Sequence, residues 1–334
     1  DEDTYSPVAG EITGSYSSDE RFVVYCRRSV GLFDGWNSAT DYFAASGEVA
    51  KKDQSYWATE KDHTWVIGNH YLTFAAYSPA EISGTVSYSN TGLTITDFSP
   101  NSQSDDQYDL MYTDRVLNRT NANNGSTPVN LTFQHALSSI VFSAMKGTEA
   151  SKTYKITGLD VKGKFINKGT FKQNITETPK TETTEYSEIA SPSWENTVRS
   201  SEVITYTPTV NEFTVGTGAN LFTGGESALL LIPQELADSD AEILLDFTVS
   251  EAEKSDVVYT DFSIPLSSFK IHNVNGSLSS ITEWERGKRY IYRIQFGGTP
   301  KIQFHPTVTQ WGDGGTAIFT IGQDIAVQGN GGNA

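Results

Sequence analysis

The chain of 334 residues carries 24 Lys and Arg side chains against 41 Asp and Glu, which gives a formal net charge of −17. Nucleic-acid-binding proteins accumulate positive charge to replace the counterions around the phosphates, so this balance argues against a nucleic-acid partner. Hydrophobic residues (37%) and aromatic residues (12%) are sufficient for globular cores, and at roughly 100 to 150 residues per domain the length predicts two domains.

Alternating apolar and polar residues predict strands along almost the whole chain. In chain order, strands are expected at residues 22–26, 71–76, 85–88, 93–98, 131–133, 154–165, 202–206, 228–232, 243–249, 257–264, 290–296, 301–304 and 317–327. Residues 135–146 fit both a short helix and a bulged strand, because several of their apolar residues have helical spacing. Many short strands separated by Gly, Asn and Pro turns predict an all-β protein built from antiparallel β-sandwiches.

Two polar stretches interrupt this pattern. Residues 118–127 predict a domain boundary, with an N-terminal domain at 1–125 and a C-terminal domain at 126–334. Residues 177–193 are predicted as a long loop within the second domain.

The motif W-x-x-G-x-x-Y occurs twice, at residues 65–71 and 284–290, each time directly before an alternating strand. This repeat indicates either two related domains or a recurrent turn in which a Trp packs under a Gly. Both interpretations can hold together.

Motifs of known catalytic or metal chemistry are absent from the sequence. It contains no HExxH, no GxxxxGK[ST], no GxGxxG after a strand and no GxSxG. The histidines show no metal-ligand spacing, and His135 is predicted as a hydrogen-bonded structural residue. Cys26 is predicted as a buried strand residue, although Arg27 and Arg28 beside it could lower the pKa of its thiol. We therefore expect no enzymatic activity, no cofactor and no metal.

Several strings of the sequence are more specific. They are LTFAAYSP at 72–79, ITDFSPNSQSDDQYDLMY at 95–112, VNLTFQHALSSIVFSAM at 129–145, YKITGLDVKGKFINKGTF at 154–171, ALLLIPQ at 228–234, and WERGKRYIYRIQF at 284–296 followed by QWGDG at 310–314. Their order resembles the fimbrillin-like family, the type V pilins and related surface adhesion proteins of Bacteroidia. The resemblance implies a structural or adhesive surface protein with two transthyretin-like β-sandwich domains in series.

The resemblance also implies how such a protein is exported and assembled. The chain would reach the cell surface as a lipoprotein of the outer membrane, attached to the membrane only through a lipid upstream of Asp1. An Arg-specific protease would remove an N-terminal segment including the first strand, and a donor strand from another pilin subunit would fill the groove. Arg21, Arg27 and Arg28 flank the strand at 22–26 and are the candidate cleavage positions. The alternative is that they only keep an edge strand soluble.

At the other end, Phe319, Ile321, Ile325 and Val327 share one face of a predicted strand and are the candidate donor-strand residues. The alternative is that residues 317–327 close the chain's own C-terminal sheet.

A second hypothesis for the function keeps the same fold. The chain would be a non-polymerising surface adhesin that binds a host or bacterial glycan or protein through exposed loops. Aromatic rings that stack on sugars would form its binding surface. The candidate rings belong to Trp36, Trp57 and Trp194.

Overall fold

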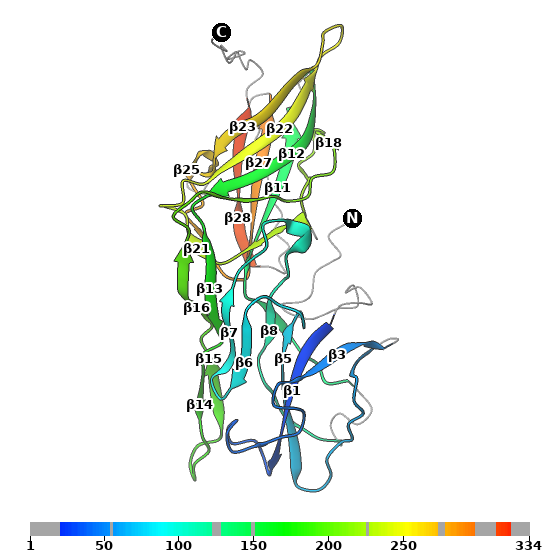
Figure 1. The fold of residues 1–334 in the computed structure, drawn as a ribbon, viewed down its shortest axis with the longest axis vertical. Helices are drawn as coiled ribbons and strands as arrows, with labels where there is room; N and C mark the ends of the chain where they lie inside the picture. Colours follow the sequence, from blue (N-terminus) through cyan, green and yellow to red (C-terminus); the bar gives the residue numbers. More distant parts are fainter. Residues whose placement is uncertain are drawn as a thin grey trace.

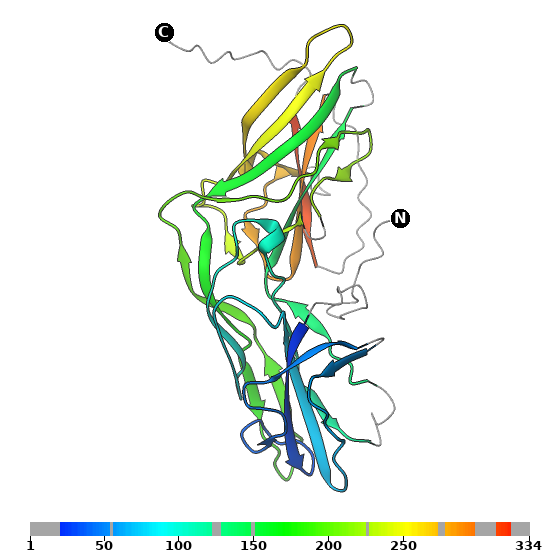
Figure 2. The ribbon, with the colours of Figure 1, turned by 45° about the vertical axis from the view of Figure 1, so that its right-hand side comes forward.

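The computed structural model describes residues 21–53, 56–121, 128–147, 151–224, 227–272, 278–297 and 312–321. Almost all of their regular structure is strand, which confirms the predicted all-β class. The short 3₁₀ helices η1 (Ser104–Asp106) and η3 (Leu266–Ser268) lie between strands. Figures 1 and 2 show an elongated molecule with two lobes stacked along its long axis.

The lower lobe in Figure 1 is built from two sheets. The first has the order β10-β8-β5-β1-β3-β4, with β2 also pairing with β1 and β9 with β5. The second has the order β16-β13-β7-β6. The bounds of these strands are β1 (Arg21–Val30), β2 (Thr40–Asp41), β3 (Glu48–Asp53), β4 (Tyr56–Thr59), β5 (His70–Ser78), β6 (Thr85–Ser89), β7 (Gly92–Phe98), β8 (Met111–Thr113), β9 (Val116–Arg119), β10 (Phe133–His135), β13 (Ile166–Lys172) and β16 (Ser193–Arg199).

The upper lobe also has two sheets, with the orders β19-β11-β27-β28 and β17-β12-β22-β23; β20 joins the first and β18 the second. The pairs β11–β27 and β27–β28 are parallel, which departs from the antiparallel pairing predicted. Smaller pairs are β21–β26 and β24–β25, while the pair β14–β15 lies in the lower lobe (Figure 1). The bounds are β11 (Ser138–Lys146), β12 (Thr153–Gly163), β14 (Ile175–Thr178), β15 (Ser187–Ala190), β17 (Ile204–Tyr206), β18 (Phe213–Thr214), β19 (Asn220–Leu221), β20 (Leu229–Leu231), β21 (Gln234–Glu235), β22 (Glu242–Ser250), β23 (Val257–Pro265), β24 (Ile271–His272), β25 (Leu278–Ser279), β26 (Glu283–Trp284), β27 (Lys288–Phe296) and β28 (Gly312–Ile321).

Three apolar cores hold these layers together. The upper core contains side chains from both sheets of its lobe, such as Phe142 of β11 and Phe247 of β22. A middle core contains Val23 of β1 and Ile95 of β7, and therefore lies between the two sheets of the lower lobe. A third core, with Phe22, covers the other face of the β1 sheet. Each lobe is thus a pair of sheets packed face to face.

The chain crosses from one lobe to the other several times. It passes from β10 to β11, from β12 to β13 and from β16 to β17, each time changing lobe. As a result β10 pairs with β8 and β13 pairs with β7, so the sheets run across the division predicted between residues 125 and 126. Residues 177–193 differ from the predicted long loop, since they contain β15 and the ends of β14 and β16.

The structure shows the conformation of two segments that the sequence left ambiguous. Residues 138–146 are the strand β11, which pairs with β27 along one edge and with β19 and β20 along the other. Seven consecutive side chains from Ser138 are buried. In the two W-x-x-G-x-x-Y motifs, Gly68 and Gly287 share a φ of 70°. Each turn leads into a strand with neighbours on both sides, β5 or β27.

A glycine substitution tests how tightly the lower lobe packs around β1. Gly47 has a φ of 79°, and a Cβ added there would lie 2.4 Å from Cγ1 of Val23. We expect Gly47→Ala to lower the free energy of unfolding by about 2 to 4 kcal/mol, through backbone strain plus overpacking. The measurement is urea unfolding followed by tryptophan fluorescence.

The matched control is Gly68→Ala. Gly68 has a φ of 70° but no atom within 4 Å of an added Cβ, so only the backbone cost of about 1 to 2 kcal/mol remains. Equal losses in the two variants would contradict the close packing of Gly47 against β1.

Candidate functional site

The first strand in the described residues, β1, occupies an internal position of its sheet (Figure 1). Along one edge Val23 to Val30 pair with β5. Along the other edge Arg21 to Val24 pair with β3, while Arg27 and Arg28 pair with β2. The interpretation of the flanking arginines as charges on an edge strand is therefore wrong, because β1 has hydrogen-bonded neighbours on both sides.

Both faces of β1 are buried as well. Phe22, Val24 and Cys26 belong to the third core, and Val23 and Tyr25 belong to the middle core. All five side chains are between 3% and 6% exposed. Without β1, the lower lobe would have a groove with two unpaired strand edges and apolar pockets on both faces.

Aromatic contacts define the pockets around two of these side chains. The ring of Phe22 lies 5.3 Å from that of Trp57 and 5.5 Å from that of Phe133. The ring of Tyr25 stacks on that of Tyr88 at 4.7 Å. Burial raises the pKa of Tyr25 well above its ordinary value.

The three candidate cleavage positions have different surroundings. Arg21 is the first residue of β1, and its Nη2 lies 2.7 Å from Oε1 of Glu81. The side chain of Arg27 is held in place, since its Nε donates to the carbonyl oxygen of Trp36 at 3.0 Å and its guanidinium pairs with Asp41. The side chain of Arg28 is exposed.

Two further residues considered for chemistry, Cys26 and His135, lie in surroundings typical of structural residues. Cys26 is buried in β1, and burial together with the carboxylate of Glu48 raises the pKa of its thiol, so the neighbouring arginines do not activate it. His135 is nearly buried, and its Nδ1 lies 2.8 Å from Oδ2 of Asp109.

Among the described residues, no group of three or more His, Cys, Asp and Glu side chains could hold a metal. No helix in the same ranges is long and apolar enough to cross a membrane.

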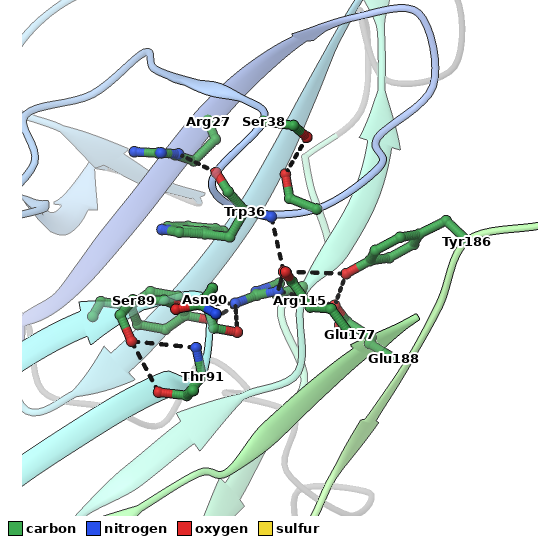
Figure 3. A network of polar contacts seen from close by, with 12 residues as sticks. Arg27, Trp36, Ser38, Ser89, Asn90, Thr91, Arg115, Glu177, Tyr186 and Glu188 are labelled. Atoms are coloured by element: carbon green, nitrogen blue, oxygen red, sulfur yellow. Dashed lines mark hydrogen bonds and ion pairs between the residues drawn. The ribbon is translucent and has the colours of Figure 1, made fainter. Parts of the chain in front are cut away.

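A buried arginine lies beside the loop that follows β1 (Figure 3). Arg115 connects β8 to β9, and its side chain has no solvent exposure. Nη1 lies 2.6 Å from Oε1 of Glu177 and 3.1 Å from Oε2 of Glu188, while Nη2 donates to two backbone carbonyls at 2.9 Å. The guanidinium lies 4.7 Å from the centre of the Trp36 ring. We call Arg115, Glu177, Glu188, Tyr186 and Trp36 the Arg115 cluster.

The positive charge of Arg115 offsets a repulsion between two carboxylates of the β14–β15 pair. Glu177 and Glu188 face each other across that pair, and like charges in such positions repel. Burial alone lowers the pKa of Arg115, but Tyr88 and Glu188 outweigh this effect and raise the pKa above its ordinary value. The sequence has no local pattern that indicates this cluster, because Arg115 is 62 and 73 residues away from its two carboxylates.

The C-terminal candidate residues are only partly described. Phe319 and Ile321 lie in β28, in register with Ile294 and Phe296 of β27. Ile325 and Val327 lie outside the described residues. Within those residues β28 pairs with β27 and so closes the sheet of its own lobe.

The three candidate tryptophans pack against other parts of the molecule. Trp36 is 5% exposed. Trp194 donates its Nε1 hydrogen to the carbonyl oxygen of Ala136 at 2.7 Å, and its ring lies 5.6 Å from that of Phe171. Trp57 packs against Phe22. Their contacts are those of packing residues rather than of a surface that binds sugars.

Comparisons with known proteins point to one family. The model of the fimbrillin-like family matches residues 30–311. The chain is similar to the crystal structure of a fimbrial protein from Bacteroides vulgatus, with 16% identity, coverage of 82% of this chain and 88% of that one, and a TM-score of 0.45. It is also similar to a putative cell adhesion protein from Bacteroides uniformis, with 14% identity, coverage of 86% and 89%, and a TM-score of 0.43. No curated protein matches the chain significantly.

Removal of the buried arginine charge tests the Arg115 cluster. Arg115→Ala leaves two facing, partly buried carboxylates without their cation and removes a fully buried side chain, and we expect the free energy of unfolding to fall by about 3 kcal/mol. The measurement is urea unfolding at neutral pH. The control is Lys172→Ala, which removes a solvent-accessible pair with Glu195 and should leave stability nearly unchanged. Similar small losses in both variants would contradict the role assigned to Arg115.

Proposed function

This chain belongs to the fimbrillin-like family, and we propose that it is a structural or adhesive subunit of a cell-surface pilus. The proposal has no enzymatic step and involves other pilin subunits as partners. It places the protein at the outer surface as a lipoprotein, attached to the outer membrane through a lipid. The transthyretin-like topology of the two lobes remains part of this proposal.

The observation that carries the proposal is the position of β1. This strand is internal to its sheet and buried on both faces, yet it is the first strand of the described residues. A single cut after it would therefore separate it from the rest of the chain. Loss of β1 would leave β5 and β3 with unpaired edges, which an extended segment from another subunit can satisfy.

Among the three arginines, Arg28 fits the cut best. Cleavage after Arg21 leaves β1 in place, because the strand begins at that residue. The side chain of Arg27 is occupied by Asp41 and Trp36. Arg28 is exposed and lies two residues before the end of β1, so cleavage after it separates almost the whole strand.

The donor segment of the proposal is residues 317–327, which begins within β28, with Phe319, Ile321, Ile325 and Val327 as its pocket-filling residues. In the described residues β28 is the last strand of its sheet order and pairs only with β27. Its release therefore breaks one ladder of hydrogen bonds, whereas insertion in place of β1 forms two. This difference favours transfer to a neighbouring subunit.

The adhesin alternative remains compatible with the fold. It has less support, because Trp36 and Trp194 pack within the molecule. Polymerisation after cleavage separates the two hypotheses.

The cleavage position is tested by Arg28→Lys. An Arg-specific protease should convert the unmodified chain to a product beginning at Ser29 and then to SDS-resistant oligomers. The variant should resist this cut and stay monomeric, whereas Arg21→Lys should be processed as usual. N-terminal sequencing and unheated SDS gels measure the result. Monomers that persist after complete cleavage at Arg28 would exclude donor-strand polymerisation.

The donor strand is tested with a synthetic peptide of residues 312–327. We expect it to bind the cleaved chain and block oligomer formation, because it competes for the two edges left by β1. The same peptide carrying Phe319→Asp should bind at least about tenfold more weakly, since a charge in an apolar pocket must be desolvated. Native mass spectrometry measures binding, and the uncut chain is the negative control. Equal binding to cut and uncut chains would contradict the proposal.

A further inference from the structure

We infer that the Arg115 cluster is an anchor that limits strand removal to β1 and keeps the following loop, residues 33–39, attached to the lower lobe. The consequence for assembly rests on the proposed function, because it concerns the state after β1 has left. The anchor itself exists in the uncut chain. Figure 3 shows its members, which come from the loop, from the turn between β8 and β9, and from the β14–β15 pair.

The loop is held by its own side chains. Phe33, Trp36 and Ala39 are 2%, 5% and 4% exposed and belong to the middle core. The ring of Phe33 packs edge-to-face on that of Tyr186 at 5.2 Å. The ring of Trp36 lies 4.7 Å from that of Tyr88. Neither aromatic partner belongs to β1.

The loop backbone is also bonded to residues far along the chain. The amide of Phe33 donates to Oδ1 of Asn118 at 2.7 Å, and the amide of Trp36 donates to Oε1 of Glu177 at 2.8 Å. The amide of Lys180 donates in the opposite direction, to Oδ1 of Asp34. These bonds connect the loop to β9 and to the β14–β15 pair.

Loss of β1 leaves most of this anchor intact. The ring contacts and hydrogen bonds described above are made with residues outside β1. From β1, Val23 and Tyr25 contribute to the middle core, and Arg27 donates a hydrogen bond to the carbonyl of Trp36 and lies 5.1 Å from its ring. After a cut at Arg28, the new N-terminus at Ser29 would lie four residues before the anchored Phe33. The strand β3 would keep its pairing with β4, and the anchored loop would hold β2, whose described partner is β1, beside the groove.

The test compares two glutamate variants of the full chain. Glu177→Ala removes the acceptor of the Trp36 amide but leaves Glu188 paired with Arg115. Glu188→Ala removes the same charge from the same cluster and keeps that acceptor, so it is the matched control. In the uncut chain, hydrogen exchange of the Trp36 amide should become at least about tenfold faster in Glu177→Ala than in Glu188→Ala. Equal rates in the two variants would overturn the anchor.

The second measurement uses the cleaved chain. After digestion with the Arg-specific protease, chymotrypsin should leave Phe33 and Trp36 uncut in the unmodified chain and should cut there in Glu177→Ala. Rapid chymotryptic cleavage of the unmodified chain as soon as β1 is released would also overturn the anchor. A failure of the first protease to release β1 contradicts the proposed function instead, and the exchange rates in the uncut chain then decide the inference alone.

Discussion

The lower lobe depends on one constraint, namely that β1 satisfies two strand edges and two apolar faces at once. An unpaired backbone edge and an empty apolar pocket are both costly in water, and β1 removes both costs. Phe22 fills the core on one face and Tyr25 the core on the other. Most of what β1 supplies is backbone pairing and apolar volume, and this is why we propose that another extended segment can take its place.

The Arg115 cluster gives this lobe a second, electrostatic connection. The protein is strongly acidic, with a net charge of −17, and the cluster places two of its carboxylates opposite each other. A fully buried guanidinium pairs with both of them, which offsets part of their charge, and also bonds to the backbone carbonyl of Ser89. The loop after β1 thereby becomes part of the lobe rather than an extension of the strand before it.

Hydrogen bonds between the lobes, together with the repeated passage of the chain, explain the extended arrangement in Figures 1 and 2. Arg286 donates to the hydroxyl of Tyr112 at 2.8 Å and to the carbonyl of His135 at 3.3 Å. The amide of Leu230 donates to Oε1 of Gln107 at 2.6 Å. Such bonds oppose bending between the lobes.

The sequence by itself determined the all-β class, the strand at 22–26 and the family, because alternation of side chains and local strings are properties of neighbouring residues. Only the tertiary structure decided that β1 is internal, that β11 is a strand and that residues 177–193 contain paired strands. It also brought Arg115 to Glu177 and Glu188. These features depend on which distant segments become neighbours, and a single sequence carries no local signal for partners 62 or 73 residues apart.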